Sequence, residues 1–229
     1  MIEILMILIW VLLIFIVTSF SAYLGKRYGI EFLIGTVVAL IVSANAIANK
    51  IIVIGPLTMT ASVVAYSMIF LVSDLIAEKW GKKEAHKAVW AGFYGVLILV
   101  IVSQVALYWQ PASISIETSE AFKKVFGTTI RVAIGSLLAY IISQHYDVFI
   151  YDLLKKKTKN KHMWIRNNLS TFSSQLISTI IFVMVAFFGV LPVIPLIIGQ
   201  WIVKCVIAVI DTPFLYFMSY IVDNTKSKK

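Results

Sequence analysis

Long apolar runs alternate with short polar stretches along the whole chain. A helix needs about 20 mostly apolar residues to cross a bilayer, and the runs are close to that length. Proline and charged residues gather between the runs, where a missing backbone donor does least harm. We therefore predict an all-α polytopic membrane protein. The seven predicted spans are Ile4–Leu24, Glu31–Asn49, Leu57–Glu78, Lys87–Trp109, Thr128–Ile150, Thr171–Leu191 and Leu196–Val222.

The composition supports a membrane protein. Hydrophobic residues make up 60% of the 229 residues and charged residues 14%, whereas soluble domains contain about 45–50% and about 25%. A soluble globule and a disordered chain are both excluded. The spans leave too few residues for a separate soluble domain, so residues 1–229 are interpreted as one integral membrane domain. Residues 1–24 contain no Lys or Arg, which predicts a retained first helix rather than a cleaved signal peptide.

The basic residues predict how the chain is oriented. It has 20 Lys and Arg residues and a formal net charge of +9. With seven spans, fifteen of the 20 fall on one side, which the positive-inside rule assigns to the cytoplasm. The N-terminus is then outside and the C-terminus inside. A six-span alternative treats the first helix as an addition and residues 30–222 as the core. The basic segments on the cytoplasmic side are Lys26–Arg27, Lys79–Lys87, Lys155–Arg166 and Lys226–Lys229.

Polar side chains inside the predicted spans are the candidate functional residues. A charge at the bilayer centre costs roughly 2.5–3.5 kcal/mol on insertion scales, so it usually faces a cavity or a partner. An apolar pocket with a few convergent polar groups is the normal form of a small-molecule site. The residues predicted to bind a substrate are Asn45, Asn49, Tyr66, Phe70, Asp74, Glu78, Gln175, Lys204 and Asp211.

Four of these residues follow one another at intervals of four in a single span. Tyr66, Phe70, Asp74 and Glu78 therefore lie along one slanted stripe of a helix. An aromatic pair followed by two carboxylates is suited to stack a flat ring and to accept its N–H groups. The alternative is ordinary packing for the two aromatic residues and interfacial solvation for Glu78.

The amide residues leave two interpretations open. Asn45 and Asn49 are four residues apart and share one helix face. Gln175 belongs to a polar stripe with Thr171 and Thr179 in the sixth span. Such amides either bind a ligand or form hydrogen bonds between helices.

The last span carries two opposite charges. Lys204 and Asp211 are seven residues apart and face the same way along a helix. We expect Lys204 to pair with Asp211 or to neutralise Asp74. A structural ion pair is the alternative to a role in binding.

Recognisable catalytic and nucleotide-binding motifs are absent from the sequence. It contains no GxxxxGK[ST], GxSxG, HExxH or GxGxxG motif. Cys205 is the single cysteine and the three histidines have no paired spacing, so no intramolecular disulfide or metal cluster is expected. We expect a protein that is not an enzyme and that has no cofactor and no metal.

Several short motifs, in their order and spacing, resemble one known family. They are Asn45-Ala-Ile-Ala-Asn49-Lys50, Tyr66…Phe70…Asp74…Glu78-Lys-Trp-Gly81, Gln144-His-Tyr-Asp147, Trp164-Ile-Arg166-Asn167-Asn168, Ser170-Thr171, Ser174-Gln175, and Lys204 followed by Asp211-Thr212-Pro213-Phe214. From about the second span to the last, the chain resembles the queuosine precursor transporter family, which is also described as vitamin-uptake-transporter-like.

The resemblance implies a function and a fold. It implies uptake across the cell membrane of 7-deazaguanine bases, 7-cyano-7-deazaguanine or its aminomethyl relative, for queuosine or archaeosine synthesis in tRNA. It also implies a six-helix core similar to the substrate-binding subunits of energy-coupling-factor vitamin transporters. The chain departs from the family pattern at Ser178, where an Asp is expected after the Ser-Gln pair, and this departure leaves the choice of base open.

The resemblance also implies how a base would be held. The carboxylates of the third span would accept the ring N–H and exocyclic amine, the amides would address the carbonyl edge, and the aromatic residues would stack. The carboxylates would also suit an aminomethyl cation. The residues themselves leave the energy source open between a proton carried by Asp74, Asp147 or Asp211 and downhill uptake as the cell consumes the base.

The expected partners are a purine-like small molecule and membrane lipid, without direct contact to nucleic acid. One alternative is the substrate-binding subunit of an energy-coupling-factor-type transporter for another vitamin, which needs a separate energising ATPase module. Others are an intramembrane lipid-modifying enzyme and a structural subunit without a ligand. The missing catalytic motifs argue against the enzyme, and the cost of buried polar residues argues against the structural subunit.

Overall fold

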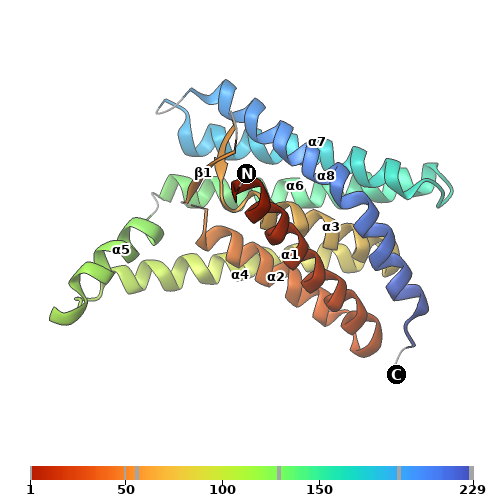
Figure 1. The fold of residues 1–229 in the computed structure, drawn as a ribbon, viewed down its shortest axis with the longest axis horizontal. Helices are drawn as coiled ribbons and strands as arrows, with labels where there is room; N and C mark the ends of the chain where they lie inside the picture. Colours follow the sequence, from red (N-terminus) through yellow and green to blue (C-terminus); the bar gives the residue numbers. More distant parts are fainter. Residues whose placement is uncertain (1, 49, 55–56, 128–129, 190–191, 227–229) are drawn as a thin grey trace.

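Eight α-helices, a short 3-10 helix and one β-hairpin make up the part of the chain that the structure describes (Figure 1). This computed structural model describes residues 2–48, 50–54, 57–127, 130–189 and 192–226. The helices are α1 (Ile2–Tyr28), α2 (Glu31–Ala46), α3 (Val63–Lys79), α4 (Lys82–Tyr108), α5 (Ile116–Phe126), α6 (Ile130–Lys157), α7 (Met163–Phe187) and α8 (Val193–Asn224), with the 3-10 helix at Ser113–Ser115.

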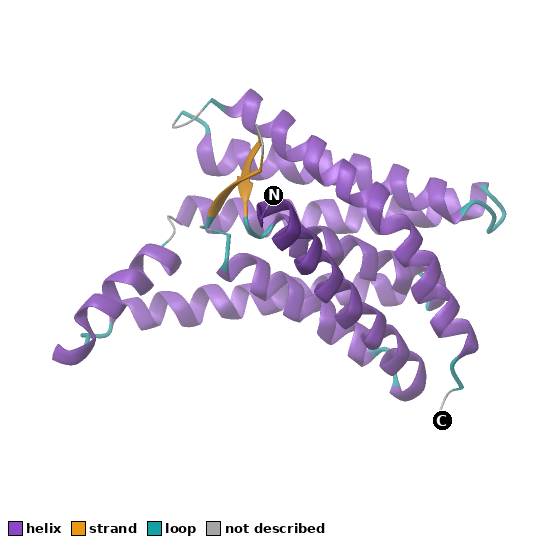
Figure 2. Ribbon diagram, in the orientation of Figure 1, coloured by secondary structure: helices purple, strands orange, loops and turns teal. Residues whose placement is uncertain are grey.

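Helix α3 is the centre of the bundle. Fourteen of its 17 residues are buried, and it contacts α1, α2, α4, α6, α7 and α8. Figure 2 shows α7 and α8 on one side of the bundle, α2 and α4 on the other, and α1 across the front. A helix that is apolar all round belongs in an interior. The polar side chains of α3 must therefore find their partners on the neighbouring helices.

The two ends of the bundle differ in chemistry. The hairpin and α5 lie at one end, whereas the α6–α7 turn and the C-terminus lie at the other (Figure 1). At this second end Lys79 bonds Asp223 at 2.6 Å, and Lys155 bonds the Glu78 carbonyl oxygen at 2.6 Å. The C-terminal ends of α3, α6 and α8 therefore lie together at this end, where Lys79 and Lys155 of the basic segments form these bonds. We call this the basic end, and its assignment to the cytoplasm remains a prediction.

Each of the seven predicted spans corresponds to a helix, but the third is corrected at its start. Leu57–Thr60 is strand β2, paired antiparallel with β1 (Ile51–Ile54) in the register Ile51 to Thr60. The run of β-branched residues in β1 favours a strand over a helix. Helix α3 therefore begins only at Val63. The helix α5, between the fourth and fifth runs, was not predicted.

Helices α7 and α4 begin earlier than predicted. Helix α7 begins at Met163 rather than Thr171, and α4 begins at Lys82 rather than Lys87. The prediction followed the apolar runs, whereas backbone hydrogen bonds continue through polar residues at the basic end. Asn49, the last residue of the second predicted span, lies outside the described residues.

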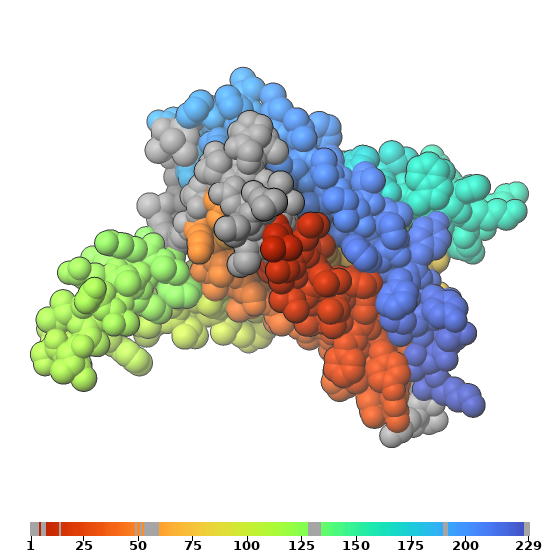
Figure 3. Space-filling view, viewed as in Figure 1, coloured from red at the N-terminus to blue at the C-terminus, as the bar shows by residue number. Residues whose placement is uncertain are grey.

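The outer surface of the bundle is apolar. Large exposed hydrophobic residues include Leu12 on α1, Val102 on α4 and Val206 on α8. Figure 3 shows α1 and α8 side by side on this face. Contiguous exposed apolar surface of this kind is unfavourable in water and suits a lipid environment.

Four of the described helices are long and apolar enough to cross a membrane. They comprise Leu8–Tyr28, Lys82–Tyr108, Met163–Phe187 and Val193–Asn224. Helix α2 has 16 residues, which rise about 24 Å at 1.5 Å per residue, and that is slightly short of the hydrocarbon core. The all-α polytopic architecture is confirmed, while the count of seven spans remains a prediction.

The predicted orientation can be tested with single cysteines in a Cys205→Ala background. Ser113 and Lys159 are exposed and lie in connections at opposite ends of the bundle. A membrane-impermeant maleimide should label Ser113→Cys in intact cells and Lys159→Cys only after permeabilisation. The reverse pattern would invert the orientation, and labelling of both sites in intact cells would remove the seven-span topology.

Candidate functional site: a polar cavity above a buried carboxyl pair

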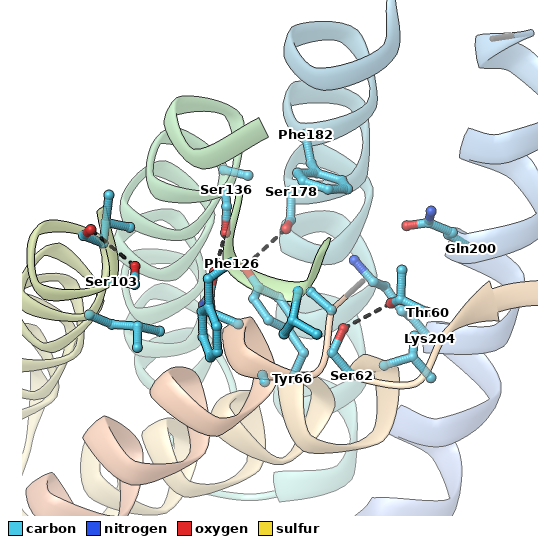
Figure 4. A pocket seen from close by; sticks show the side chains of 18 of the residues that line it. Thr60, Ser62, Tyr66, Ser103, Phe126, Ser136, Ser178, Phe182, Gln200 and Lys204 are labelled. Atoms are coloured by element: carbon cyan, nitrogen blue, oxygen red, sulfur yellow. Dashed lines mark hydrogen bonds between the residues drawn. The ribbon is translucent and has the colours of Figure 1, made fainter. Parts of the chain in front are cut away.

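A cavity of about 120 Å³ lies among the helix ends near the hairpin (Figure 4). One water molecule needs roughly 10–15 Å³ by this measure, so the cavity has room for a small ring system. Residues of β2 and of every helix from α2 to α8 line it. The polar lining residues are Asn45, Thr60, Ser62, Tyr66, Ser103, Gln104, Ser136, Ser178, Gln200 and Lys204.

Tyr66 joins three helices inside the cavity. Its hydroxyl group lies 3.3 Å from Ser178 Oγ on α7 and also contacts Ser143 on α6. The ammonium group of Lys204, from α8, lies 5.1 Å from the centre of the Tyr66 ring. This is the geometry of a cation–π contact. Tyr66 is therefore in the large cavity.

Lys204 does not form either of the predicted ion pairs. Its side chain is buried, and Nζ donates to Thr179 Oγ1 at 3.0 Å. Seven residues along a helix correspond to a rise of about 10.5 Å, so Lys204 and Asp211 face the same way without meeting. Asp211 lines a different, smaller cleft. The expectation that Lys204 pairs with Asp211 or with Asp74 is wrong.

Asn45 lines the cavity and also connects two helices. Its Oδ1 accepts a hydrogen bond from Ser136 Oγ on α6 at 2.8 Å, and its Nδ2 donates to the Ile41 carbonyl at 2.8 Å. Both interpretations of this amide therefore have a physical basis, because Asn45 lines the cavity and also accepts a hydrogen bond that links α2 to α6. Asn49 lies outside the described residues, and its place on the same helix face stays a prediction.

Phe70 and Asp211 line the small cleft between α3, α7 and α8. Asn167 and Thr171 complete much of its wall. Its volume of about 10 Å³ corresponds to no more than a single water molecule. The Phe70 ring packs on Tyr66 with centres 5.9 Å apart. Phe70 thus lines the small cleft and packs on Tyr66, which lines the cavity. This arrangement agrees with the packing alternative.

Asp74 and Asp147 form a buried carboxyl pair below the cavity. Both side chains are completely buried, and their carboxyl groups are within hydrogen-bonding reach of each other. Asp147 Oδ1 accepts from Ser174 Oγ at 2.8 Å. Within the described part of the chain, neither oxygen of Asp74 has a hydrogen-bond donor. A shared proton would let the two carboxyl groups bond each other.

Two glutamines are buried on the helices that hold Asp147 and Ser174. Gln144 lies on α6 and Gln175 on α7, and both are completely buried. In the described structure, neither carboxamide has a hydrogen-bond partner. Buried polar groups without partners are uncommon and need an explanation, such as a ligand or a water. Gln175 does not line the cavity.

An ion-pair network closes the basic end of the bundle. Arg166 is 1% exposed, and its NH2 group lies 2.8 Å from Glu78 Oε1. The Tyr151 hydroxyl donates to Glu78 Oε2 at 3.1 Å, and Lys155 lies 3.5 Å from the same oxygen. Arg166 also donates to the Lys161 carbonyl oxygen at 2.9 Å. We call these side chains the inner network.

The four residues of this α3 stripe thus reach four different environments. Tyr66 enters the cavity, Phe70 lines the small cleft, Asp74 meets Asp147, and Glu78 meets Arg166. The pattern predicted that the four side chains share one side of the helix and could line one pocket. The structure does not bring them together in a single pocket. Polar groups therefore occur along α3 both at the cavity and toward the basic end, with Phe70 between them.

Sequence reasoning missed the partners of this stripe. Arg166 was assigned to a basic connection, although it lies four residues before Ser170 and eight before Ser174 on the same face of α7. Tyr151 likewise lies four residues after Asp147 on α6. These four-residue intervals were a usable signal. Ser136 carried none, because a lone serine in a span commonly bonds only its own helix.

Two histidines meet on the other side of α6. His86 Nδ1 on α4 and His145 Nδ1 on α6 are 2.6 Å apart. They are far apart in the sequence, so spacing alone did not bring them together. Among the described residues, no group of three potential His, Cys, Asp or Glu ligands is close enough to hold a metal ion.

Comparison with known proteins places the chain in a family. Residues 60–218 match the family described as "Putative vitamin uptake transporter". The chain belongs to this family. A 187-residue segment is 38% identical to a "Probable queuosine precursor transporter" of Bacillus subtilis (strain 168), covering 80% of this chain and 81% of that protein. No solved structure matches the chain.

The match to the vitamin uptake transporter family covers most of the site. It begins at the end of β2 and reaches into the last third of α8, so it includes Tyr66, Asp74, Arg166 and Lys204. Asn45 and the first two helices lie before it. The chain is a multi-pass membrane protein of this family, and its cavity, carboxyl pair and inner network fall largely in the region that the family shares.

The inner network should contribute strongly to stability. Arg166→Met would leave Glu78 largely buried without its main partner, and breaking a buried pair typically costs about 3–5 kcal/mol. We expect a markedly lower unfolding temperature in detergent, and recovery in the double variant Glu78→Gln/Arg166→Met.

A matched control is available in the exposed pair of Lys87 and Glu84, which lie 2.6 Å apart. Lys87→Met should change the free energy of unfolding by about 0–1 kcal/mol at most, because exposed pairs contribute little. Equal effects of Arg166→Met and Lys87→Met would contradict a structural role for the inner network.

Proposed function

We propose that this transporter imports queuosine precursors, the 7-deazaguanine bases, across the cell membrane. The observation that carries the proposal is the 38% identity to a protein named as a queuosine precursor transporter. The shape and lining of the cavity support it independently. A small-molecule site typically combines apolar walls with a few placed polar groups, and this cavity has that composition.

The chemistry of the lining fits a purine-like base. Such a ring offers N–H donors on one edge and acceptors on the other. Amide and hydroxyl groups of Gln104, Ser178 and Gln200 line the cavity and can both donate and accept. Phe126 and Phe182 supply apolar ring surface in the same wall. No lining group is an acid, so recognition in the cavity rests on neutral groups and on Lys204.

The arrangement of polar residues supports a route through the bundle. We infer that the base enters the cavity at the hairpin end and moves along α3 toward the basic end. The carboxyl pair of Asp74 and Asp147 lies on this route and offers acceptors for the N–H groups of a passing base. The inner network joins α3, α6 and α7 beyond it and must open for release.

The proposed function is tested by uptake of labelled 7-deazaguanine bases. Cells that cannot make queuosine, and that lack an energising ATPase module, should accumulate label when they express this chain. Unlabelled base should compete, whereas guanine and an unrelated vitamin should compete poorly. No accumulation with the protein present in the membrane would contradict the function. Uptake that requires an added ATPase module would favour the substrate-binding-subunit alternative.

The role of Asp74 is tested by Asp74→Asn. A hydrogen bond to a charged group contributes about 1.5–3 kcal/mol. Loss of the bond between the Asp74 carboxylate and the base should therefore lower uptake by about tenfold or more. The matched control is Asp152→Asn on α6, whose carboxylate pairs with the exposed Lys156 at 2.7 Å. Unchanged uptake by Asp74→Asn at equal membrane levels would remove Asp74 from the route.

A further inference from the structure

We infer that Lys204 makes the cavity selective for neutral bases that carry a hydrogen-bond acceptor and against cationic bases of the same ring. The inference rests on the proposed function and deepens it. It concerns which substituted base the cavity accepts, a choice that neither the sequence nor the related protein decides.

The electrostatics of the cavity depend on one side chain. Among the residues that the structure describes around the cavity, Lys204 alone is charged, and Asp and Glu are absent. The carboxylates on which an aminomethyl group was expected to bind lie elsewhere. Asp74 is below the cavity beside Asp147, and Asp211 is in the small cleft. The cavity is therefore a site of positive potential.

Lys204 lacks an anionic partner. Its side chain is 7% exposed, and no ion pair between described side chains includes it. Nζ has the Thr179 hydroxyl at 3.0 Å and the face of the Tyr66 ring at 5.1 Å. An ammonium group has three N–H donors. A buried cation with a single hydrogen-bond acceptor is costly unless another group compensates it.

A ligand in the cavity can supply that compensation. Figure 4 shows the Lys204 side chain reaching from α8 into the group that includes Tyr66 and Ser178. A nitrile nitrogen or a carbonyl oxygen accepts a hydrogen bond from an ammonium group, and such charge-assisted bonds are about twice as strong as neutral ones. A base with a neutral acceptor substituent therefore satisfies Lys204.

A cationic substituent has the opposite effect. An aminomethyl group is protonated at neutral pH, because alkyl amines such as that of lysine titrate near 10. Two cations confined in a partly desolvated cavity repel each other strongly. Lys204 therefore weakens the binding of bases with a protonated amine substituent, compared with bases whose substituent is neutral and of the same size.

Competition in the unaltered protein separates charge from size. The labelled substrate is 7-cyano-7-deazaguanine, and the unlabelled competitors are the cyano, carboxamide and aminomethyl derivatives of the same ring. The carboxamide is neutral and close in size to the aminomethyl group. We expect the cyano and carboxamide bases to compete similarly and the aminomethyl base about tenfold or more less well. Equal competition by the aminomethyl base would overturn the inference.

Variants of Lys204 test the cause. Lys204→Met keeps the length and removes the charge, so the ratio between aminomethyl and cyano competition should shift toward one. Lys204→Arg keeps the charge and should preserve the discrimination. The matched control is Lys124→Met, an exposed lysine on α5 next to the lining residue Val125, which should leave the ratio unchanged.

The outcomes separate this inference from the proposed function. If no deazaguanine base accumulates, the proposed function fails. If the bases accumulate but Lys204→Met retains full discrimination, only the role of Lys204 fails. If Lys204→Met does not reach the membrane, the competition series in the unaltered protein still decides between charge and size.

Discussion

Because α3 is almost entirely enclosed by other helices, its polar side chains cannot be hydrated by bulk water and must be satisfied from within the bundle. This constraint organises the rest of the structure. Asp74 faces Asp147 of α6, and Glu78 meets Arg166 of α7. In a lipid environment unsatisfied polar groups are costly. The positions of α6 and α7 around α3 are therefore linked to the same residues that form the polar route.

The interior separates two kinds of electrostatic environment. Near the hairpin, hydroxyl and amide groups surround a single lysine. Toward the basic end, acids predominate until Arg166 and Lys155 balance them. A base that leaves a site of positive potential would next meet acceptors for its N–H groups. On the proposed route, this gradation would let a neutral base with an acceptor substituent bind first and then move inward.

The hydropathy pattern along the sequence was enough to locate helices, but it did not predict the hairpin, the short polar helix or the contacts of Lys204. Apolar runs located a helix for each of the seven predicted spans, because a run of apolar residues of this length favours a helix that is buried or faces lipid. The hairpin was missed because Leu57–Thr60 runs directly into the apolar run of α3, and hydropathy does not distinguish a strand from a helix over so few residues. Helix α5 was missed because it is short and polar. The Lys204 ion pairs were wrong because a shared face does not imply contact across two turns.

Composition, hydrophobic period and motif order were enough to predict the class of protein, the approximate helices and the family from the sequence alone. The sequence also marked Asn45, Tyr66 and Lys204, which line the cavity, without showing that they do. Only the tertiary structure decided that the acids lie outside that cavity and that Arg166 is buried against Glu78. The reason is that a helix face fixes direction alone, whereas contact depends on how neighbouring helices are placed against it.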